Sequence, residues 1–355
     1  MHDRDGRAAK IIILGLVLAS AGAALADVFA MPDGLTSLEF VTVGNPGNPG
    51  ELTAVGDDPV QFPGRICGRV DYVYRIGKFE VTAGQYCEFL NAVAKTDTYG
   101  LYDEGMDYWA DPISEGCNIL RAGLNGDYAY TVAGDWANRP VNRVSWPSAA
   151  RFCNWLANGQ PVGAQDLSTT EDGSYLLAGI TQGYGGSVVR KPRARYVIPT
   201  EDEWYKAAYH KNDGATANYW DYPTQSDLPP IAGAPPGTAE PPGSGCYYNN
   251  DLDAHPIGAP YYRTEGGAYV LSPGPYGTFD QGGNVLEYCE TVPDDGPPRV
   301  VRGGSYGGAG GLEANYGFGP SFAFSHVGFR VAEVPEPAGL FLLAAGGLGI
   351  LRSRR

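Results

Sequence analysis

The chain has 355 residues and carries 40 acidic against 25 basic side chains, a formal net charge of −15 at pH 7. An acidic chain repels phosphate backbones, and since no basic stripe interrupts it, we exclude nucleic acid as a partner. The 51 glycines and 28 prolines argue against a regular helical or doubly wound fold, whereas the 12% aromatic content argues against disorder. We therefore expect one loop-rich domain.

Residues 1–26 are predicted to be a secretory signal peptide. Arg4, Arg7 and Lys10 precede an apolar run over 11–18, and Ala24 to Ala26 form a small-x-small cleavage site. An uncleaved anchor is the alternative, but the run is shorter than the roughly 20 residues that a spanning helix needs. We therefore expect export, to the cell envelope or the extracellular space.

The first regular elements are expected between residues 71 and 93. Residues 71–76 alternate in the manner of a strand. Thr82 and Gln85 then form a capping box, the signature of a helix start. The apolar residues that follow recur at helical spacing and predict one buried face, made of Tyr86, Phe89, Leu90 and Val93.

Two further helices are predicted downstream. Ser145 is suited to the N-cap of the first and Pro147 to its opening turn. Its apolar stripe consists of Ala149, Phe152, Cys153 and Leu156. Thr200 and Glu203 make another capping box, in front of an inner face that consists of Trp204, Ala207 and Ala208.

The rest of the chain is expected to be irregular. Residues 223–245 are dense in proline and glycine, which predicts a surface excursion, and short strands are expected over 299–302 and 328–331. The six cysteines are Cys67, Cys87, Cys117, Cys153, Cys246 and Cys289. Export permits disulfides, but the spacing selects no connectivity, and some thiols are expected to fill the core.

At the C-terminus, the sequence VPEP at 334–337 is followed by an apolar segment, 338–351, and by terminal arginines. Residues 334–355 thus resemble the PEP-CTERM sorting tail of bacteria that make extracellular polysaccharide. The resemblance implies cleavage near the Pro-Glu-Pro motif by an exosortase-type transpeptidase, with only transient membrane contact through the terminal segments. An ordinary C-terminal anchor is the alternative, although the segment is short for a full span.

Several motifs follow one another in a distinctive order along the body of the chain. They are YRIGKFEVT at 74–82, PVNRVSW at 140–146, PTEDEW at 199–204, GTFDQGGNVLEY at 277–288, RGGSY at 302–306 and GFR at 328–330. This series resembles the formylglycine-generating, or sulfatase-modifying factor, family. The resemblance implies that family's α+β fold, a loop-rich C-type-lectin-like variant with few regular elements, over residues 27–333.

The oxidases of that family use two cysteines after the RGGS element to bind copper(I) and activate oxygen. The matching positions here are Gly308 and Glu313, and no cysteine follows Cys289. Since neither glycine nor a carboxylate replaces a soft thiolate ligand, we expect no copper. The histidines outside the signal peptide have no metal-ligand spacing, so we expect them on the surface or in the core.

The resemblance also implies calcium, which the family binds at the loop before Gly-Asn-x-x-Glu. Carried over to this sequence, the site comprises the Asp280 carboxylate and the main-chain carbonyls of Gln281, Gly283 and Val285. Glycines in the loop let the backbone turn its oxygens inward. The alternative is that Asp280 only stabilises a turn.

The remaining candidate cluster lies in the same motifs and consists of Asn284, Glu287, Arg302 and Arg330. We expect a buried structural network, in which arginines pair with carboxylate and amide groups and pin the loops, and we assign no catalytic residue. Two tryptophans of the family appear as Leu286 and Tyr288, so the groove that they help to wall is expected to differ in shape.

Scaffold, sorting tail and missing thiols together predict an exported, non-catalytic member of the family. We expect it to act as a binding or structural module for a protein or glycan at the cell surface or in the extracellular matrix. The alternative is an oxidoreductase of the formylglycine-generating type that acts on a substrate cysteine, or another reaction in the same groove. A matrix protein without a specific ligand is the third hypothesis.

Overall fold

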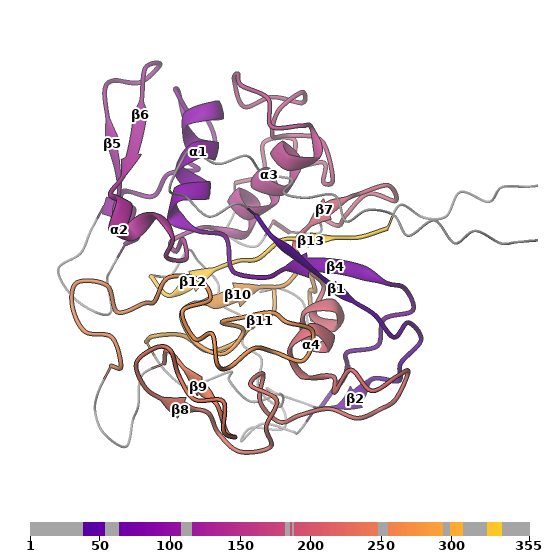
Figure 1. The fold of residues 1–355 in the computed structure, drawn as a ribbon. Coiled ribbons are helices and arrows are strands. Elements are labelled where there is room, and N and C mark those ends of the chain that lie inside the picture. Colours follow the sequence, from indigo (N-terminus) through magenta and orange to yellow (C-terminus); the bar gives the residue numbers. More distant parts are fainter. Residues whose placement is uncertain are drawn as a thin grey trace, which may run out of the picture.

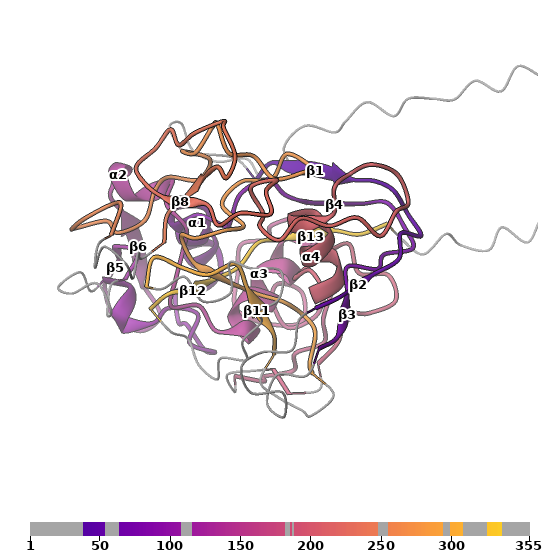
Figure 2. The same ribbon diagram turned by 90° about the horizontal axis from the view of Figure 1, so that it is seen from below.

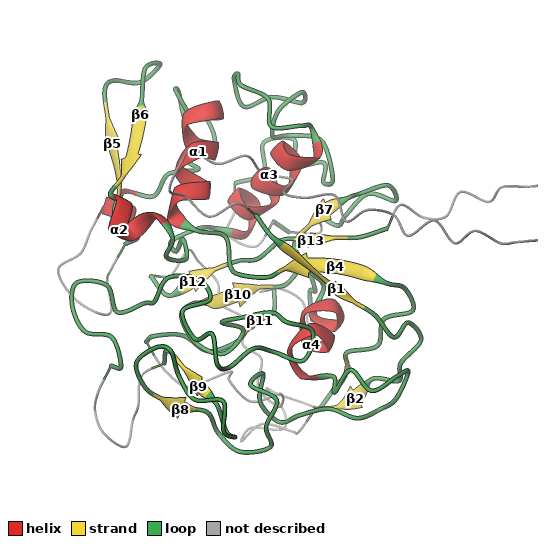
Figure 3. Cartoon of the chain, in the orientation of Figure 1, coloured by secondary structure: helices red, strands yellow, loops and turns green. Residues whose placement is uncertain are grey.

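The structure is a computed structural model that describes residues 38–53, 64–107, 116–181, 185–186, 188–247, 255–293, 299–307 and 325–335. Loops make up most of this part of the chain, and the helices and strands are short (Figure 3). Within these ranges, no helix combines the length and the apolar character needed to cross a membrane.

Three helices lie where the capping signals predict them: α1 (Ala83–Val93), α3 (Trp146–Ala157) and α4 (Glu201–Tyr209). At α1 and α4, the hydroxyls of Thr82 and Thr200 accept a hydrogen bond from the backbone N–H of the third helical residue, Gln85 or Glu203. The side chains of Gln85 and Glu203 in turn accept a hydrogen bond from the backbone N–H of Thr82 and Thr200. Ser145 caps α3. Two short helical turns that the sequence did not predict are α2 (Gly134–Ala137) and η1 (Glu104–Asp107).

A four-stranded antiparallel sheet joins the beginning and the end of the domain. Its order is β1 (Phe40–Val43), β4 (Tyr74–Gly77), β13 (Ala332–Glu333) and β7 (Tyr196–Val197). The strand predicted over 71–76 begins only at Tyr74, because residues 71–72 form a bend. From this bend the Tyr72 hydroxyl donates to Glu203.

A three-stranded sheet brings the last three motifs together, in the order β11 (Val301–Arg302), β10 (Leu286–Tyr288) and β12 (Val327–Gly328). Three two-stranded pairs are β2 (Glu51–Leu52) with β3 (Ile66–Cys67), β5 (Ile119–Ala122) with β6 (Ala129–Val132), and β8 (Ile231–Ala232) with β9 (Ser244–Gly245). The segment 223–245 contains β8 and β9 and is otherwise irregular, as its composition predicts.

Helices cover both sides of the four-stranded sheet. α1 and α3 lie together on one side of it and α4 lies on the other (Figures 1 and 2). Tyr86 and Phe89 of α1 pack against Phe152 and Trp155 of α3 and against Phe329, with ring centroids 5.2 to 6.5 Å apart. The apolar faces predicted for these helices are therefore buried, and they form the core.

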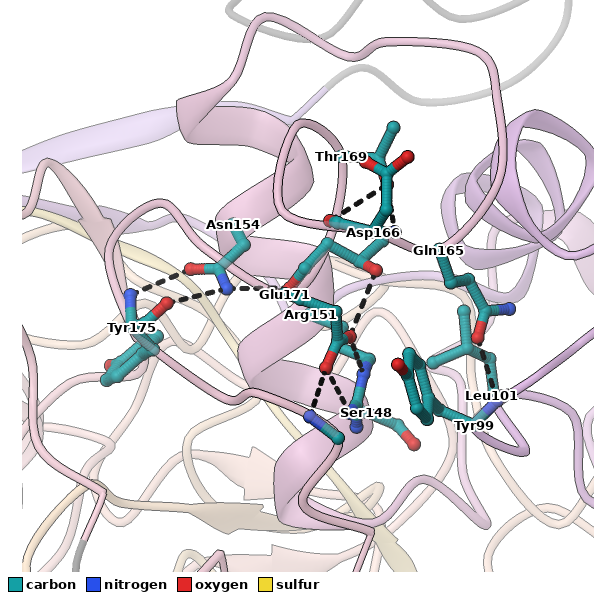
Figure 4. A network of polar contacts seen from close by, with 12 residues as sticks. Tyr99, Leu101, Ser148, Arg151, Asn154, Gln165, Asp166, Thr169, Glu171 and Tyr175 are labelled. Atoms are coloured by element: carbon teal, nitrogen blue, oxygen red, sulfur yellow. Dashed lines mark hydrogen bonds and ion pairs between the residues drawn. The ribbon is translucent and has the colours of Figure 1, made fainter.

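The long loop after α3 is held by a buried ion pair. Arg151 Nε and Nη2 donate to the two carboxylate oxygens of Glu171 at 2.6 and 2.9 Å (Figure 4). The Asn154 amide donates to the main-chain carbonyls of Thr170 and Tyr175. These contacts give the loop a defined path without regular secondary structure.

Candidate functional site

The loop that precedes β10 carries the residues predicted to bind calcium. Asp280 and Gly283 have φ angles of 60° and 115°, so the backbone turns sharply at both positions. Gly283 admits no side chain, because a Cβ there would lie 2.5 Å from the carbonyl oxygen of Cys246. The Gln281 carbonyl oxygen lies close to Gly303, where an added Cβ would be 2.9 Å from it. Close packing therefore fixes this loop.

Asp280 is partly buried and its carboxylate has one backbone partner. Oδ2 accepts a hydrogen bond from the Gly267 N–H at 2.6 Å. Burial raises the pKa of Asp280 to about 6, although the Gly267 hydrogen bond and the nearby Arg330 charge act to lower it. Ionising this carboxyl is therefore costly, and a bound cation would reduce that cost.

A small polar cavity adjoins this carboxylate. Its volume of about 10 Å³ is on the order of one water molecule or one ion, and Thr278, Asp280, Gln281 and Ser244 are among the residues that line it. Thr278 Oγ1 and Gln281 Oε1 are buried and have no hydrogen-bond partner within the described ranges. Unsatisfied oxygens beside a carboxylate suit a hard cation such as Ca²⁺.

Glu80 adds a second carboxyl that sequence analysis missed. Its side chain is 2% exposed, and neither carboxylate oxygen has a hydrogen-bond partner in the part of the chain that is described. Burial raises its pKa well above the usual value, and the Asp280 and Glu287 charges raise it further. The segment is held there because Phe279 N–H donates to the Lys78 carbonyl. The FEVT motif predicts a helix start, but it carries no signal for the proximity of Glu80 to Asp280.

The remaining predicted ligands are backbone groups. Val285 is fully buried, and Gly283 N–H donates to the Gly303 carbonyl. In the described ranges, no three His, Cys, Asp or Glu side chains are grouped so that they could hold a metal ion. A cation at this loop would therefore depend on Asp280 and on uncharged oxygens, with the Glu80 carboxyl close to Asp280 but outside the lining of the cavity.

Two of the predicted network residues form an ion pair. Arg330 Nε and Nη2 donate to the Glu287 carboxylate at 2.5 and 2.6 Å, and both side chains are fully buried. Trp204 Nε1 donates to the same carboxylate at 2.8 Å. Arg330 also donates to the carbonyls of Gly77 and Phe279, so it connects β4 with the loop before β10.

The other two network residues lie close by but have different partners. Arg302 is opposite Glu287 in the β10–β11 ladder, yet its guanidinium pairs with Glu201 of α4 at 2.5 Å. Asn284 Oδ1 accepts from the backbone N–H and the hydroxyl of Thr264. Sequence analysis did not single out Glu201 as a partner of Arg302.

All six cysteines are buried and none forms a disulfide. Cys67 and Cys289 belong to one cluster with the aromatic rings of Trp204 and Tyr205. Arg302 Nη2 donates to the Cys67 sulfur at 3.8 Å. Gly308 and Glu313, the positions that match the copper thiols, lie outside the described residues.

Residues 68–334 match the family described as the sulfatase-modifying factor enzyme 1-like domain, FGE-sulfatase. This chain belongs to that family. The match covers most of the chain and includes the Arg330–Glu287 and Arg302–Glu201 ion pairs and the loop before β10. The predicted fold class, the loop-rich α+β sulfatase-modifying-factor fold, a C-type-lectin-like variant, is thereby confirmed. A search of curated proteins found no match.

Several solved structures resemble the chain over 84% of its length. The crystal structure of CarF is 22% identical with a TM-score of 0.43 and is covered to 98%. Treponema denticola variable protein 1 is 19% identical with a TM-score of 0.46 and is covered to 96%. PvdO from Pseudomonas aeruginosa is 16% identical with a TM-score of 0.45 and is covered to 95%. At these values the likenesses carry no argument about function.

Proposed function

We propose that this family member is an exported, non-catalytic module that binds a protein or glycan at the cell surface or in the extracellular matrix. The observation that carries the proposal is the absence of any cysteine after Cys289. The positions of the two copper-binding thiols are occupied by Gly308 and Glu313, which are not soft ligands.

The burial of the existing thiols supports this proposal. Thiolate, not thiol, is the metal ligand and the nucleophile. Burial raises the pKa of Cys67 and Cys246 to about 12 and that of Cys289 well above its usual value. Cys67 and Cys289 share a cluster but are 2% and 0% exposed, so they do not offer a substrate two accessible thiolates.

Binding is tested with glycan arrays and pull-downs on residues 27–337, followed by titration with purified components. We expect a glycan or protein ligand whose binding is saturable. The absence of any ligand in both experiments would count against the module and favour a matrix protein without a specific partner.

Catalysis is tested by copper analysis and by oxygen consumption with cysteine-containing peptides. We expect no copper and no turnover in the natural chain. The matched variant Gly308→Cys with Glu313→Cys places thiols at both family positions, so it is expected to gain copper(I) binding. Stoichiometric copper with turnover in the natural chain would instead establish the oxidoreductase alternative.

We also propose that calcium binds at the cavity beside Asp280. The unpartnered oxygens of Thr278 and Gln281 and the uncompensated carboxyl of Glu80 support it. Calcium should raise the melting temperature of the natural chain, and Asp280→Asn should abolish that rise. Asp127→Asn, at an exposed position far from the loop in sequence, is the matched control and should behave like the natural chain.

The pKa of Asp280 sets the expected pH dependence. Because its folded pKa of about 6 exceeds the usual 3.8, the stabilisation from the protonated form is present below pH 3.8 and is lost as the pH rises through 6. Calcium should therefore stabilise the chain more at pH 7.5 than at pH 5. An equal calcium effect at both pH values, or in Asp280→Asn, would contradict the site.

We propose further that export removes residues 1–26 and that an exosortase-type transpeptidase cuts the tail near 335–337, leaving only transient membrane contact. The composition of the two termini supports this route. Mass spectrometry of the protein recovered from the envelope and the medium tests it. We expect a mature chain that begins near residue 27 and lacks the terminal arginines. Recovery of the intact chain would contradict processing.

A further inference from the structure

Arg263 is a fully buried arginine with an incomplete set of hydrogen bonds. Its Nη2 donates to the main-chain carbonyl of Gly116, whereas Nε and Nη1 have no hydrogen-bond partner among the residues that the structure describes. The guanidinium carbon lies 5.8 Å from the ring centroid of Trp136, on α2, and 5.2 Å from that of Tyr306. These rings favour a cation at their faces, but they supply no oxygen to the free N–H groups.

The positive charge of this side chain is permanent. Guanidinium does not lose its proton in proteins, so burial cannot be relieved by neutralisation. Buried charges are normally paired with an opposite charge. Within the part of the chain that the structure describes, no carboxylate forms an ion pair with Arg263.

The surroundings of Arg263 add positive charge. Arg139 Nη1 donates to the Arg263 main-chain carbonyl, and Arg139 lies over the ring of Tyr261. Burial lowers the pKa of Arg139, and the Arg263 charge contributes to that lowering. Two carboxylates, Glu265 and Asp135, act to raise the pKa of Arg139, and Asp135 accepts a hydrogen bond from the Tyr261 hydroxyl. Neither of them forms an ion pair with Arg263 among the described residues, so the unpaired charge of Arg263 favours an anion.

The free hydrogens have the arrangement that a carboxylate needs. Nη2 carries two hydrogens, one beside the Nε hydrogen and one beside an Nη1 hydrogen. One Nη2 hydrogen is donated to the Gly116 carbonyl. Whichever hydrogen that is, the other Nη2 hydrogen lies beside an unpartnered N–H, either that of Nε or one of Nη1. The pair forms a two-hydrogen fork, the geometry in which arginine binds a carboxylate.

We propose that Arg263 binds a small monovalent anion, a short carboxylate or a halide, on its fork of unpartnered N–H groups. The ligand must be small because Arg263 has no exposed surface, which excludes an acidic polymer on the outside of the molecule. The site is independent of the calcium loop and of the surface partner proposed above, so its failure leaves those proposals intact.

The test uses the full chain in a methanesulfonate buffer of constant ionic strength, titrated separately with chloride, formate and acetate. We expect the melting temperature to rise and then saturate, by about 5 °C at a hundredfold excess over the dissociation constant. The three titrations distinguish a halide from a carboxylate. Arg263→Gln should lose the saturable rise, whereas Arg193→Gln, at an exposed arginine, should keep it.

Bromide soaked into crystals of the natural chain gives a second readout that does not depend on a variant that folds. An anomalous peak within hydrogen-bond distance of Nη1 or Nε is expected. A carboxylate of the protein itself on the fork would overturn the proposal. So would an equal anion response in Arg263→Gln, or a bromide peak without any anion-dependent melting temperature, which would mean an adventitious ion only.

Discussion

Among single residues, His210 shows how burial sets a protonation state. Its Nδ1 accepts from the Asn212 N–H at 3.2 Å and lies 2.7 Å from the Tyr276 hydroxyl. Because a backbone N–H can only donate, Nδ1 carries no hydrogen, and Nε2 donates to the Thr216 carbonyl at 3.2 Å. Burial lowers the pKa of this imidazole. The His210 imidazole is therefore neutral in the folded state.

This residue predicts a loss of stability in mild acid. With its pKa lowered in the folded state, the unfolded chain takes up the proton first, so stability is lost as the pH falls below about 6.5. Urea unfolding at pH 7.5 and pH 5.5 measures the loss, which should be smaller in His210→Gln. Part of it should persist there, since burial also lowers the pKa of His326. Equal losses in both proteins would contradict the prediction.

At the scale of elements, the capping boxes of α1 and α4 differ in the contacts that their third helical side chains make beyond the helix. Thr82 and Gln85 of α1 satisfy each other's backbone groups. Glu203 of α4 also accepts from Arg190 at 2.8 and 2.9 Å and from Tyr72. The second box therefore anchors a network and not only a helix end.

Replacements at the two boxes should separate these roles. Thr82→Ala is expected to cost about 1 kcal/mol of unfolding free energy, the usual value of an N-cap, and Thr82→Ser should restore it. Glu203→Ala is expected to cost about 2–3 kcal/mol, because it removes the third helical side chain of the box and one of the two carboxylates that pair with Arg190, which keeps Glu290. Urea unfolding at pH 7.5 measures all three. Similar costs for the two alanine variants would refute the distinction.

The loop after α3 should depend on Arg151 and Glu171. Glu171→Ala is expected to destabilise the fold by about 3–5 kcal/mol, because the arginine charge remains buried without a partner. The double variant Arg151→Met with Glu171→Leu should be less destabilised than the single one, since it removes both charges. A double-mutant cycle, with unfolding free energies measured in denaturant, tests this coupling. Additive free-energy changes for the two single variants would contradict the buried pair.

At the scale of the whole molecule, the thiols report on the integrity of the fold. All six are buried and unpaired, so the native protein should be inert to a thiol reagent such as Ellman's. After unfolding in guanidinium, all six should react. Fewer reactive thiols in the unfolded protein would reveal disulfides and contradict the structure.

Much of the fold could be predicted because its signals are local. The helix starts at Thr82, Ser145 and Thr200 lie where the structure has them, since a capping bond spans only three residues. The buried faces of the helices were predicted from apolar residues that recur about once per helical turn. The start of β4 was misplaced, because strand formation at 71–73 depends on a neighbour far away in the chain.

The candidate sites were predicted only in part, because some of their residues are far apart in the sequence. The loop motif identified Asp280 and Glu287, but Glu80 lies 200 positions earlier in the chain than Asp280 and has no spacing signal. Glu201 and Arg302 are 101 positions apart. Arg263 belongs to none of the motifs.

The sequence by itself determined the family, the three capped helices, the acidic character and the missing thiols, because these are properties of composition or of contacts within a few residues. Only the tertiary structure decided which carboxylate each arginine meets and which buried oxygens and N–H groups remain without partners. In a loop-rich fold, those outcomes depend on where segments far apart in sequence are packed, and the free energy of that packing is not encoded in any single short motif.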